Sequence, residues 1–262
     1  MATARKTAIT RLREGSLEAA DDRVAIEEPL QVTVDGHPIA VVMRTPGHDE
    51  DLTLGFLLSE GIISAASQVA RIDLPEDENH ARVFLADSHT LDLQRLTRHL
   101  FSASSCGICG KATVEAITTN HPPVTSPTTF ASEAILEAPD TLRAAQATFD
   151  QTGGLHASGL FSSEGELLAI REDVGRHNAV DKILGYAARE GLETGSCFLM
   201  LSGRISFELM QKALALGIPL VAGISAPSSL AVEFAEASGQ SLIGFLRPPT
   251  FNIYAGGGRV TT

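Results

Sequence analysis

The sequence predicts an α/β protein. In its second half, short apolar runs typical of strands alternate with amphipathic segments typical of helices, and the links between them are short. This alternation favours parallel neighbouring strands joined by right-handed crossovers. The first half contains a strand pair, a helix and a further strand, which predicts a smaller α/β unit. The 262 residues are enough for one large domain or two small ones.

The first elements are a tail and a hairpin. Residues 1–20 are polar and charged without clear periodicity, so we expect a mobile N-terminal tail. Two strand-like runs follow at 31–34 and 39–43, separated by Asp35-Gly36. Because Asp-Gly between β-rich runs is a strong hairpin signal, we expect these two runs to pair.

A helix comes next. Thr45-Pro46 predicts its start, since Thr can cap a helix and Pro fits the first helical position. Gly61 predicts its end, and the apolar run 83–85 predicts a further short strand. Together these elements predict a small α/β subdomain over residues 21–100.

The second half is more regular. Residues 121–129 hold three prolines, so we expect an extended segment that ends a cysteine loop and linker at 101–125 and precedes a domain at 126–262. The strands 157–161 and 167–170 flank a polar turn and predict a hairpin. The remaining expected elements are helices at 139–149, 178–189, 207–216 and 229–237 and strands at 198–201, 220–224 and 242–246.

Charge and composition exclude several classes of protein. Lys and Arg number 20 against 32 Asp and Glu, so the formal net charge is −12, which argues against a general nucleic-acid binder. No apolar run is long enough to span a bilayer, and the first residues lack the apolar core of a secretory signal. With three cysteines a disulfide framework is not expected. We therefore expect a cytoplasmic protein that binds neither nucleic acid nor membrane.

Two of the three cysteines, Cys106 and Cys109, form a CxxC pair, whereas Cys197 adjoins an apolar strand and is expected in the core. A structural zinc site would need a second pair of ligands. A thioredoxin-like redox pair and a nucleophilic thiol that carries a group are the other functional interpretations, beside two incidental thiols. Flanking glycines, Lys111 and a following helix start favour the reactive thiolate.

The motifs around this pair resemble those of one family. SSCGICG at 104–110 resembles the cysteine loop of the formate dehydrogenase accessory sulfurtransferases, the FdhD/NarQ family. Further segments match that family in order from about Glu28 to Tyr254. They are RTPGHD at 44–49, LGFL at 54–57, EGI at 60–62, TGGLH at 152–156, EDVGRHNAVDK at 172–182, SGR at 202–204, SAPS at 225–228 and FNIY at 251–254.

The resemblance implies a sulfurtransferase. Such a protein takes sulfane sulfur from a cysteine desulfurase and passes it to the molybdenum cofactor, bis-molybdopterin guanine dinucleotide, for formate dehydrogenase. Cys106 matches the family's persulfide-carrying cysteine, and Cys109 matches its second cysteine. The resemblance also implies a homodimer and no tightly bound metal. The alternatives are a non-catalytic chaperone for the cofactor and, less favoured, a zinc-binding CxxC protein.

A phosphate-rich ligand needs local binding groups in a chain of net charge −12. Two strand-to-helix junctions supply small residues, hydroxyls and free backbone N–H groups: Ser202-Gly203-Arg204 and the segment from Ser225 to Ser229. Arg204 would add a bidentate cation. In an open parallel sheet such junctions lie at the carboxyl ends of strands, where ligands tend to bind. The alternative for each serine is a purely structural role as an ordinary helix cap or turn residue.

Other candidate binding residues rest more on the resemblance. The segment Phe251, Asn252, Ile253, Tyr254, Ala255 and Gly256 aligns with the family segment assigned to cofactor binding. His177 and Arg176 are candidates for the edge of the site, although a pairing of Arg176 with Asp173 and a capping Asn178 would explain the same run. His156 is interpreted as a structural histidine.

The family's second half resembles the cytidine deaminase fold. The resemblance therefore implies a mixed sheet with helices on both faces, beside the smaller N-terminal α/β subdomain. Deaminase chemistry itself is disfavoured, since zinc deaminases need His-x-Glu and Pro-Cys-x-x-Cys. Here Ser158 stands where Glu would be required and Ser105 where Pro would precede Cys106.

Overall fold

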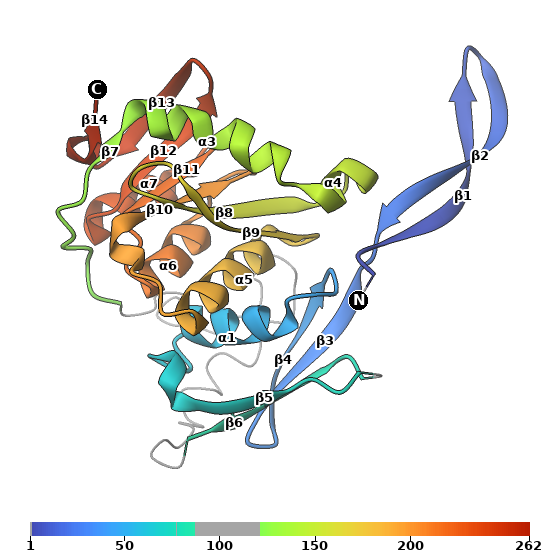
Figure 1. Cartoon of the computed structure of the whole chain (residues 1–262), viewed down its shortest axis with the longest axis horizontal. Coiled ribbons are helices and arrows are strands. Elements are labelled where there is room, and N and C mark those ends of the chain that lie inside the picture. The colour runs from blue at the N-terminus through green and yellow to red at the C-terminus, as the bar shows by residue number, and fades with distance from the viewer. Residues whose placement is uncertain (1, 77, 87–120) are drawn as a thin grey trace.

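The computed structural model describes residues 2–76, 78–86 and 121–262 (Figure 1). The expectations for Cys106, Cys109 and a helix after them lie outside the described residues. A large sheet with its helices forms most of the described chain, and a smaller sheet lies below it in Figure 1. No helix among the described residues is long and apolar enough to cross a membrane.

The large sheet has six strands in the order β13-β12-β11-β10-β8-β9. Strands β10, β11 and β12 are parallel, whereas β8, β9 and β13 run antiparallel to their neighbours, so the sheet is mixed as predicted. The strand bounds are β8 (His156–Ser162), β9 (Leu167–Asp173), β10 (Cys197–Leu201), β11 (Leu220–Gly223), β12 (Ser241–Arg247) and β13 (Thr250–Ala255). A separate parallel pair joins β7 (Phe130–Ala131) to β14 (Val260–Thr261).

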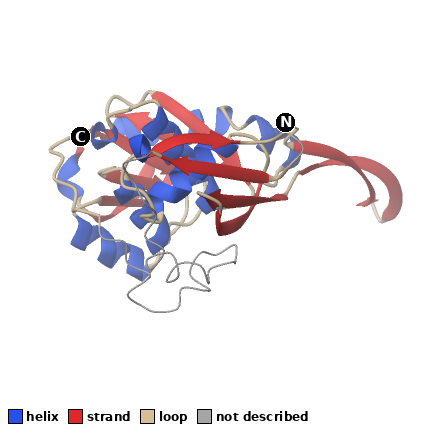
Figure 2. Ribbon diagram, turned by 90° about the horizontal axis from the view of Figure 1, so that it is seen from below, coloured by secondary structure: helices blue, strands red, loops and turns tan. Residues whose placement is uncertain are grey.

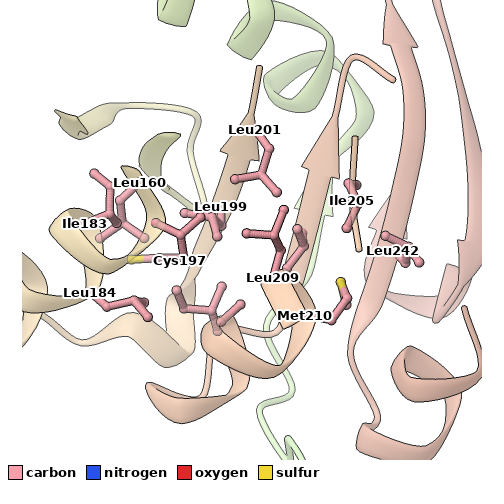
Figure 3. Packing of buried hydrophobic residues seen from close by; sticks show 14 of the residues in the cluster. Leu160, Ile183, Leu184, Cys197, Leu199, Leu201, Ile205, Leu209, Met210 and Leu242 are labelled. Carbon is pink, nitrogen blue, oxygen red and sulfur yellow. The ribbon is translucent and has the colours of Figure 1, made fainter. Parts of the chain in front are cut away.

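Helices cover both faces of this sheet, which confirms the predicted architecture. Because side chains alternate along a strand, Leu199 and Leu201 of β10 face one apolar cluster, whereas Phe198 and Met200 face another. The first cluster includes residues of three helices, and Figure 3 shows Leu209 and Met210 within it. These helices are α5 (Arg176–Arg189), α6 (Phe207–Ala215) and α7 (Ser229–Ser238). The second cluster packs against α3 (Ser132–Ala144).

The helix predicted at 139–149 is wrong in its bounds. Helix α3 begins at Ser132, and a separate helix, α4 (Ala147–Thr152), follows it. The prediction placed Pro139 at a helix start, where Pro is common. In the fold, burial of Ile135 against the sheet extends the helix through an earlier turn, so Pro139 lies inside it.

The smaller sheet has the order β4-β3-β6-β5. Its strands are β3 (Glu28–Val34), β4 (His37–Arg44), β5 (Val69–Asp73) and β6 (His80–Leu85). Asp35 and Gly36 both have positive φ, 47° and 79°, in the tight turn between β3 and β4, which confirms the predicted hairpin. Helix α1 (Asp49–Ser59) shares an apolar cluster with this sheet, so the smaller α/β unit is present.

The predicted helix start at Thr45-Pro46 is wrong. Helix α1 begins at Asp49 after His48, which has a φ of 57° and makes no side-chain cap. Thr45 is instead bound to the large unit: its backbone N–H donates to Asp173 at 3.1 Å, and its hydroxyl accepts from Val174. These tertiary bonds use the groups that a cap would need.

The segment predicted as a mobile tail, residues 1–20, contains regular structure. Residues 4–25 form a hairpin of β1 (Ala4–Arg13) and β2 (Ser16–Ala25), which projects from the body in Figures 1 and 2. Glu14 and Gly15 turn the chain with positive φ. A ribbon exposed on both sides needs no apolar alternation, so the sequence pattern gave no strand signal. The division of the chain into domains stays a prediction.

The two units meet where α1 crosses α5. A Cβ added to Gly55 of α1 would lie 1.8 Å from the Asp181 carbonyl oxygen, and one added to Gly185 of α5 would lie 1.8 Å from that of Asp51. Only glycine allows two helix backbones to touch in this way. The crossing therefore fixes α5, and with it the residues at the start of that helix, relative to the smaller unit.

Candidate anion-binding site

One edge of the large sheet gathers the predicted binding residues Ser202, Arg204, Ser225 and His177. The parallel strands β10, β11 and β12 end there, and the antiparallel pairing of Leu201 with Ser158 and of His156 with Asp173 brings the start of β8 and the end of β9 to the same edge. We call this the carboxyl edge: residues 202–206 and 225–228, His156, and the first turn of α5. Both predicted junctions lie on it.

The two junctions form one continuous surface. The Ile205 N–H donates to the Ala226 carbonyl at 3.2 Å, and the Ser228 N–H donates back to the Ile205 carbonyl at 2.9 Å. A Cβ on Gly223 would lie 3.0 Å from the Ile205 side chain, so the second junction approaches the first closely. A ligand at one junction would therefore also face the other.

The serines of these junctions have different tasks. The Ser202 hydroxyl accepts from the Ala157 N–H at 2.8 Å and ties β10 to β8. The Ser228 hydroxyl caps α7 by accepting from Ala231. The hydroxyls of these two serines therefore make structural bonds within the protein. Ser225 is half-buried, its carbonyl accepts from the Phe245 N–H at 3.1 Å, and its side chain makes no hydrogen bond to the described chain.

A group of cations surrounds the start of β8. Burial, with Arg176, His177 and Arg204 nearby, lowers the pKa of His156 below its ordinary value of 6.5. Neither Arg176 nor Arg204 forms an ion pair with another described residue, and Arg176 Nε is buried without a hydrogen-bond partner in the described chain. Arg204 is exposed. Within a chain of net charge −12, this edge is locally positive and suited to an anion.

Asp173 lies beside these cations but is occupied elsewhere. It is fully buried, and Lys182 Nζ lies 2.8 Å from its carboxylate. The same carboxylate accepts from the Gly175 N–H and from the Asn178 side chain. The alternative in which Asp173 pairs with Arg176 is therefore wrong, and the Arg176 guanidinium has no acidic partner among the described residues.

His177 serves the fold more than the edge. It is buried, and its Nε2 lies 2.9 Å from the Glu208 carboxylate of α6. This contact joins the first turns of α5 and α6.

The segment from Phe251 to Gly256 does not converge on one point, because β13 is the outermost strand and runs along β12 from its carboxyl end to its amino end. Asn252 pairs with Gly244 near the second junction, so Phe251 and Asn252 lie towards the carboxyl edge. Ala255 pairs with Leu242. Gly256 lies against Ser241, at the opposite end of β12. Ile253 and Tyr254 lie between them, the first exposed and the second packed on the core.

The sequence favours a structural role for His156 and leaves the role of Arg176 open, yet both lie at the carboxyl edge, and the sequence does not single out Phe245. The signal for the first two was available, since both adjoin strand ends that the alternation places at one edge. Phe245 was hidden inside the run 242–246, which reads as one buried strand. In the structure a register shift between Gly244 and Arg247 interrupts the ladder, and Phe245 is exposed.

Cys197 is a core residue, as predicted. It is 3% exposed within the cluster of Figure 3, and burial raises the pKa of its thiol. Cys106 and Cys109 lie outside the described residues. The described part of the chain holds no group of three or more His, Cys, Asp or Glu side chains arranged for a metal ion.

A sequence model of the FdhD/NarQ family matches residues 25–261. The chain belongs to the FdhD/NarQ family. The match begins where the projecting hairpin ends, so it covers both sheets and the carboxyl edge.

Relatives within the FdhD/NarQ family are similar over nearly their whole length. The sulfur carrier protein FdhD of Streptomyces avermitilis is 46% identical over 96% of this chain and 94% of its own. The protein of that name from Sulfolobus acidocaldarius is 43% identical over 95% of this chain and 96% of its own. A formate dehydrogenase accessory protein from Desulfotalea psychrophila shares the fold, with a TM-score of 0.83, 24% identity and coverage of 99% and 100% of the two chains.

Proposed function

We propose that this protein is a sulfurtransferase of formate dehydrogenase maturation. It accepts sulfane sulfur from a cysteine desulfurase as a persulfide on Cys106 and transfers the sulfur to bis-molybdopterin guanine dinucleotide. The observation that carries the proposal is the similarity, at 43–46% identity across 94–98% of this chain, to proteins named as sulfur carriers.

The loading step is an exchange between sulfur atoms. The Cys106 thiolate attacks the outer sulfur of the desulfurase persulfide, a new S–S bond forms on Cys106, and the desulfurase cysteine leaves as a thiolate. The outer sulfur and its proton move together, so no oxidant or reductant is consumed. Cys109, three residues away, is the thiol placed to assist release of the sulfur.

The third cysteine is unsuited to this step. Sulfur exchange requires an accessible thiolate, because the thiolate is the nucleophile. Cys197 is 3% exposed, and burial raises the pKa of its thiol, so it is held as a neutral core residue. The carrier role is thereby left to the CxxC pair.

The acceptor would bind at the carboxyl edge. Its phosphates need positive charge and donors, which Arg176 and Arg204 supply without an acidic ion-pair partner among the described residues. Asp173 and Glu208, the nearby acids, are held by Lys182 and His177. The edge thus supports the molybdenum-cofactor part of the proposal.

Sulfur loading is the first test. The protein is incubated with a cysteine desulfurase and cysteine, and intact and peptide mass spectrometry locate added sulfur. We expect one added sulfur on Cys106 in the wild type and in Cys197→Ala, and none at this position in Cys106→Ala. A wild-type protein that never carries the sulfur would overturn the proposal.

Formate dehydrogenase activity separates transfer from mere binding. In cells that depend on this protein, we expect Cys106→Ala to abolish active formate dehydrogenase while GDP binding by the purified variant is retained. A cofactor chaperone without sulfur chemistry would keep the enzyme active in that variant. Stoichiometric zinc in the wild-type protein that is absent from the Cys106→Ala and Cys109→Ala variants would favour the zinc-binding alternative instead. The homodimer implied by the resemblance stays a prediction.

A further inference from the structure

Asp173 is a buried carboxylate where the two units meet, and it is 0% exposed. Its Oδ1 accepts from the Gly175 N–H and from Asn178 Nδ2, both at 2.8 Å. Its Oδ2 accepts from the Thr45 N–H at 3.1 Å, and Lys182 Nζ lies 2.8 Å from the same oxygen. Four donors occupy the acceptor positions that a carboxylate offers. The group is therefore held in one orientation.

Helix α5 begins directly after this carboxylate and depends on it. Gly175, the N-cap, has no side chain with which to cap the helix. Asp173 supplies an acceptor instead, because its bond to the Gly175 N–H, two residues on, forms an Asx turn. Its negative charge also lies at the positive end of the helix dipole. Arg176 is the first residue of α5, so this turn sets the direction in which its side chain leaves the helix.

The smaller unit supplies further bonds to the same segment. The Thr45 hydroxyl accepts from the Val174 N–H at 3.2 Å, and the Thr45 carbonyl accepts from Lys182 Nζ at 2.8 Å. The Met43 carbonyl accepts from Asn178 Nδ2 at 2.7 Å. The end of β4 therefore helps to hold the start of α5.

Joining the two units does not require this carboxylate. The glycine crossing of α1 and α5 already brings two helix backbones into contact. Burying a carboxylate and an ammonium costs desolvation energy that an apolar contact would not. In some proteins such buried polar groups fix a single geometry rather than add stability. Here the geometry in question is that of the first turn of α5.

Asp173 also lies among the cations of the carboxyl edge. It pairs with His156 across β8 and β9, and Arg176 follows three positions later. Lys182 offsets its charge, but a carboxylate this close to the edge still works against an anionic ligand. Its charge therefore does not explain its presence at the edge, whereas a positional role does.

We propose that Asp173 is a positioning residue for the anion at the carboxyl edge. It holds Arg176 in the orientation that binds phosphate, and residues 43–45 of the smaller unit are its second support. The inference rests on the proposed function, since it concerns how the same acceptor is held. Charge-assisted bonds from a guanidinium depend on geometry, so a rotation of the first turn of α5 would weaken them.

The test compares isosteric changes in two buried Asp–Lys pairs. Asp173→Asn alters the pair at the start of α5, and the control Asp181→Asn alters the pair with Lys212, which contacts α1 and α6 instead. Calorimetry measures the dissociation constant of inorganic pyrophosphate for the full chain, and urea unfolding measures stability.

The sign of the change separates position from charge. On charge alone, loss of a carboxylate beside the edge strengthens anion binding. We expect the opposite: Asp173→Asn weakens pyrophosphate binding by about tenfold, because Arg176 loses its binding orientation. Asp181→Asn should lower stability and leave pyrophosphate binding unchanged. Tighter or unchanged binding by Asp173→Asn, or an equal loss in Asp181→Asn, would overturn the inference.

A double-variant cycle shows whether Asp173 acts through Arg176. In the Arg176→Ala background, Asp173→Asn should not weaken pyrophosphate binding by more than about twofold, because the side chain that it positions is gone. A loss as large as that in the wild-type background would contradict the proposal.

Thr45→Val tests the second support without altering the buried charge. It is isosteric and removes the acceptor of the Val174 N–H. The matched control is Thr53→Val in α1, whose buried hydroxyl donates to the Asp49 carbonyl. We expect Thr45→Val to weaken pyrophosphate binding by about threefold and Thr53→Val to leave it unchanged. Equal affinities of the two variants would refute the inference even if Asp173→Asn does not fold.

Failure of this inference is distinct from failure of the proposed function. Wild-type protein that binds pyrophosphate, with affinity unaltered by the changes at Asp173 and Thr45, refutes the positioning role alone. Wild-type protein that binds neither pyrophosphate nor GDP refutes the anion site and this inference with it. Sulfur loading on Cys106 is measured separately.

Discussion

The crossing of α1 and α5 and the carboxyl edge are both rich in charge, but they use it differently. At the crossing, the Asp51 carboxylate lies 2.7 Å from Arg171 and 3.0 Å from Arg189. Close by, Lys212 of α6 lies 2.9 Å from Asp181. At the edge, Arg176 and Arg204 have no acidic partner among the described residues.

This difference separates structural from functional charge. A buried charge with its partner fixes geometry, and removing one member leaves the other uncompensated. An unpaired cation at an edge adds little to folding and is available to an anionic ligand. Helix α5 joins the two regions, because it begins at the edge and crosses α1 further along. The crossing therefore positions Arg176 at the start of α5, while the acidic side chains of the crossing pair with other cations.

The largest expected effect tests the crossing. We expect Gly185→Ala to lower the free energy of unfolding by about 5 kcal/mol, the exceptional end of single substitutions, because helix backbones cannot yield as side chains do. The new Cβ would stand 1.8 Å from the Asp51 carbonyl oxygen. Urea unfolding measures the change. Gly195→Ala, whose Cβ would meet nothing within 4 Å, is the control and should stay within about 0.5 kcal/mol.

The next prediction concerns the buried pair. Lys212→Met leaves Asp181 buried with only Ser59 as a hydrogen-bond donor, so we expect a loss of about 4 kcal/mol in urea unfolding. The double variant Asp181→Leu/Lys212→Met should recover most of this loss. A double variant as unstable as the single one would mean that packing, not charge, decides stability here.

The pH dependence that Lys212 contributes has a definite sign. Burial lowers the pKa of Lys212, but Asp181 and Glu60 outweigh it and raise the pKa above its ordinary 10.5. The unfolded chain therefore loses this proton first as the pH rises. This contribution of Lys212 is full below pH 10.5 and is lost only as the pH rises through the higher folded value. By contrast, burial raises the pKa of Asp181 above its ordinary 3.8, which opposes folding once the unfolded carboxyl ionises.

The third prediction concerns the edge, where we expect a substitution to lower ligand affinity and leave stability nearly unchanged. We expect Arg204→Ala to weaken binding of GDP or pyrophosphate by about 2 kcal/mol, since it removes a charge-assisted bond, and to change stability by less than about 0.5 kcal/mol. The matched control is Arg189→Ala at the crossing, which should leave anion affinity unchanged and cost at most about 1 kcal/mol of stability. Equal anion affinity in Arg204→Ala would remove Arg204 from the site.

The order of the elements could be predicted from sequence because it follows local patterns. Alternation of apolar strands and amphipathic helices in the second half predicts β10, β11 and β12 as parallel neighbours, and Asp35-Gly36 predicts the first hairpin of the smaller sheet. The projecting hairpin could not be predicted in this way. It buries no apolar face, and its strands are joined by the backbone pairing that runs from Ala4 and Ala25 to Arg13 and Ser16.

The site was only partly predictable for a related reason. The placement of Ser202, Arg204 and Ser225 at one edge was predictable, because strand-to-helix junctions of a parallel sheet share an edge. The partners that decide which groups are occupied come from distant segments. Glu208 lies 31 positions after His177, and Thr45 binds Asp173 across 128 positions. No local pattern shows which cations such contacts leave unpaired.

The smallest expected effect concerns protons at His156. Burial and the neighbouring cations lower its folded pKa, so the unfolded chain binds the proton more readily and stability falls as pH drops through 6.5. A bound anion would offset Arg176 and Arg204 and raise this pKa. Anion binding should therefore take up protons near pH 6 and strengthen about threefold between pH 7.5 and 5.5, a gain below about 1 kcal/mol.

Calorimetry in buffers of different ionisation enthalpy measures this proton uptake. The His156→Gln variant retains the ligand's own protonation and loses the protein's, so the difference between the two proteins isolates His156. Uptake that persists unchanged in the variant would place the anion away from the start of β8. Proton uptake that disappears in the variant would show that His156 and Arg204 belong to one binding surface. Only an anion close to both side chains can offset the effect of the Arg204 charge on the pKa of His156.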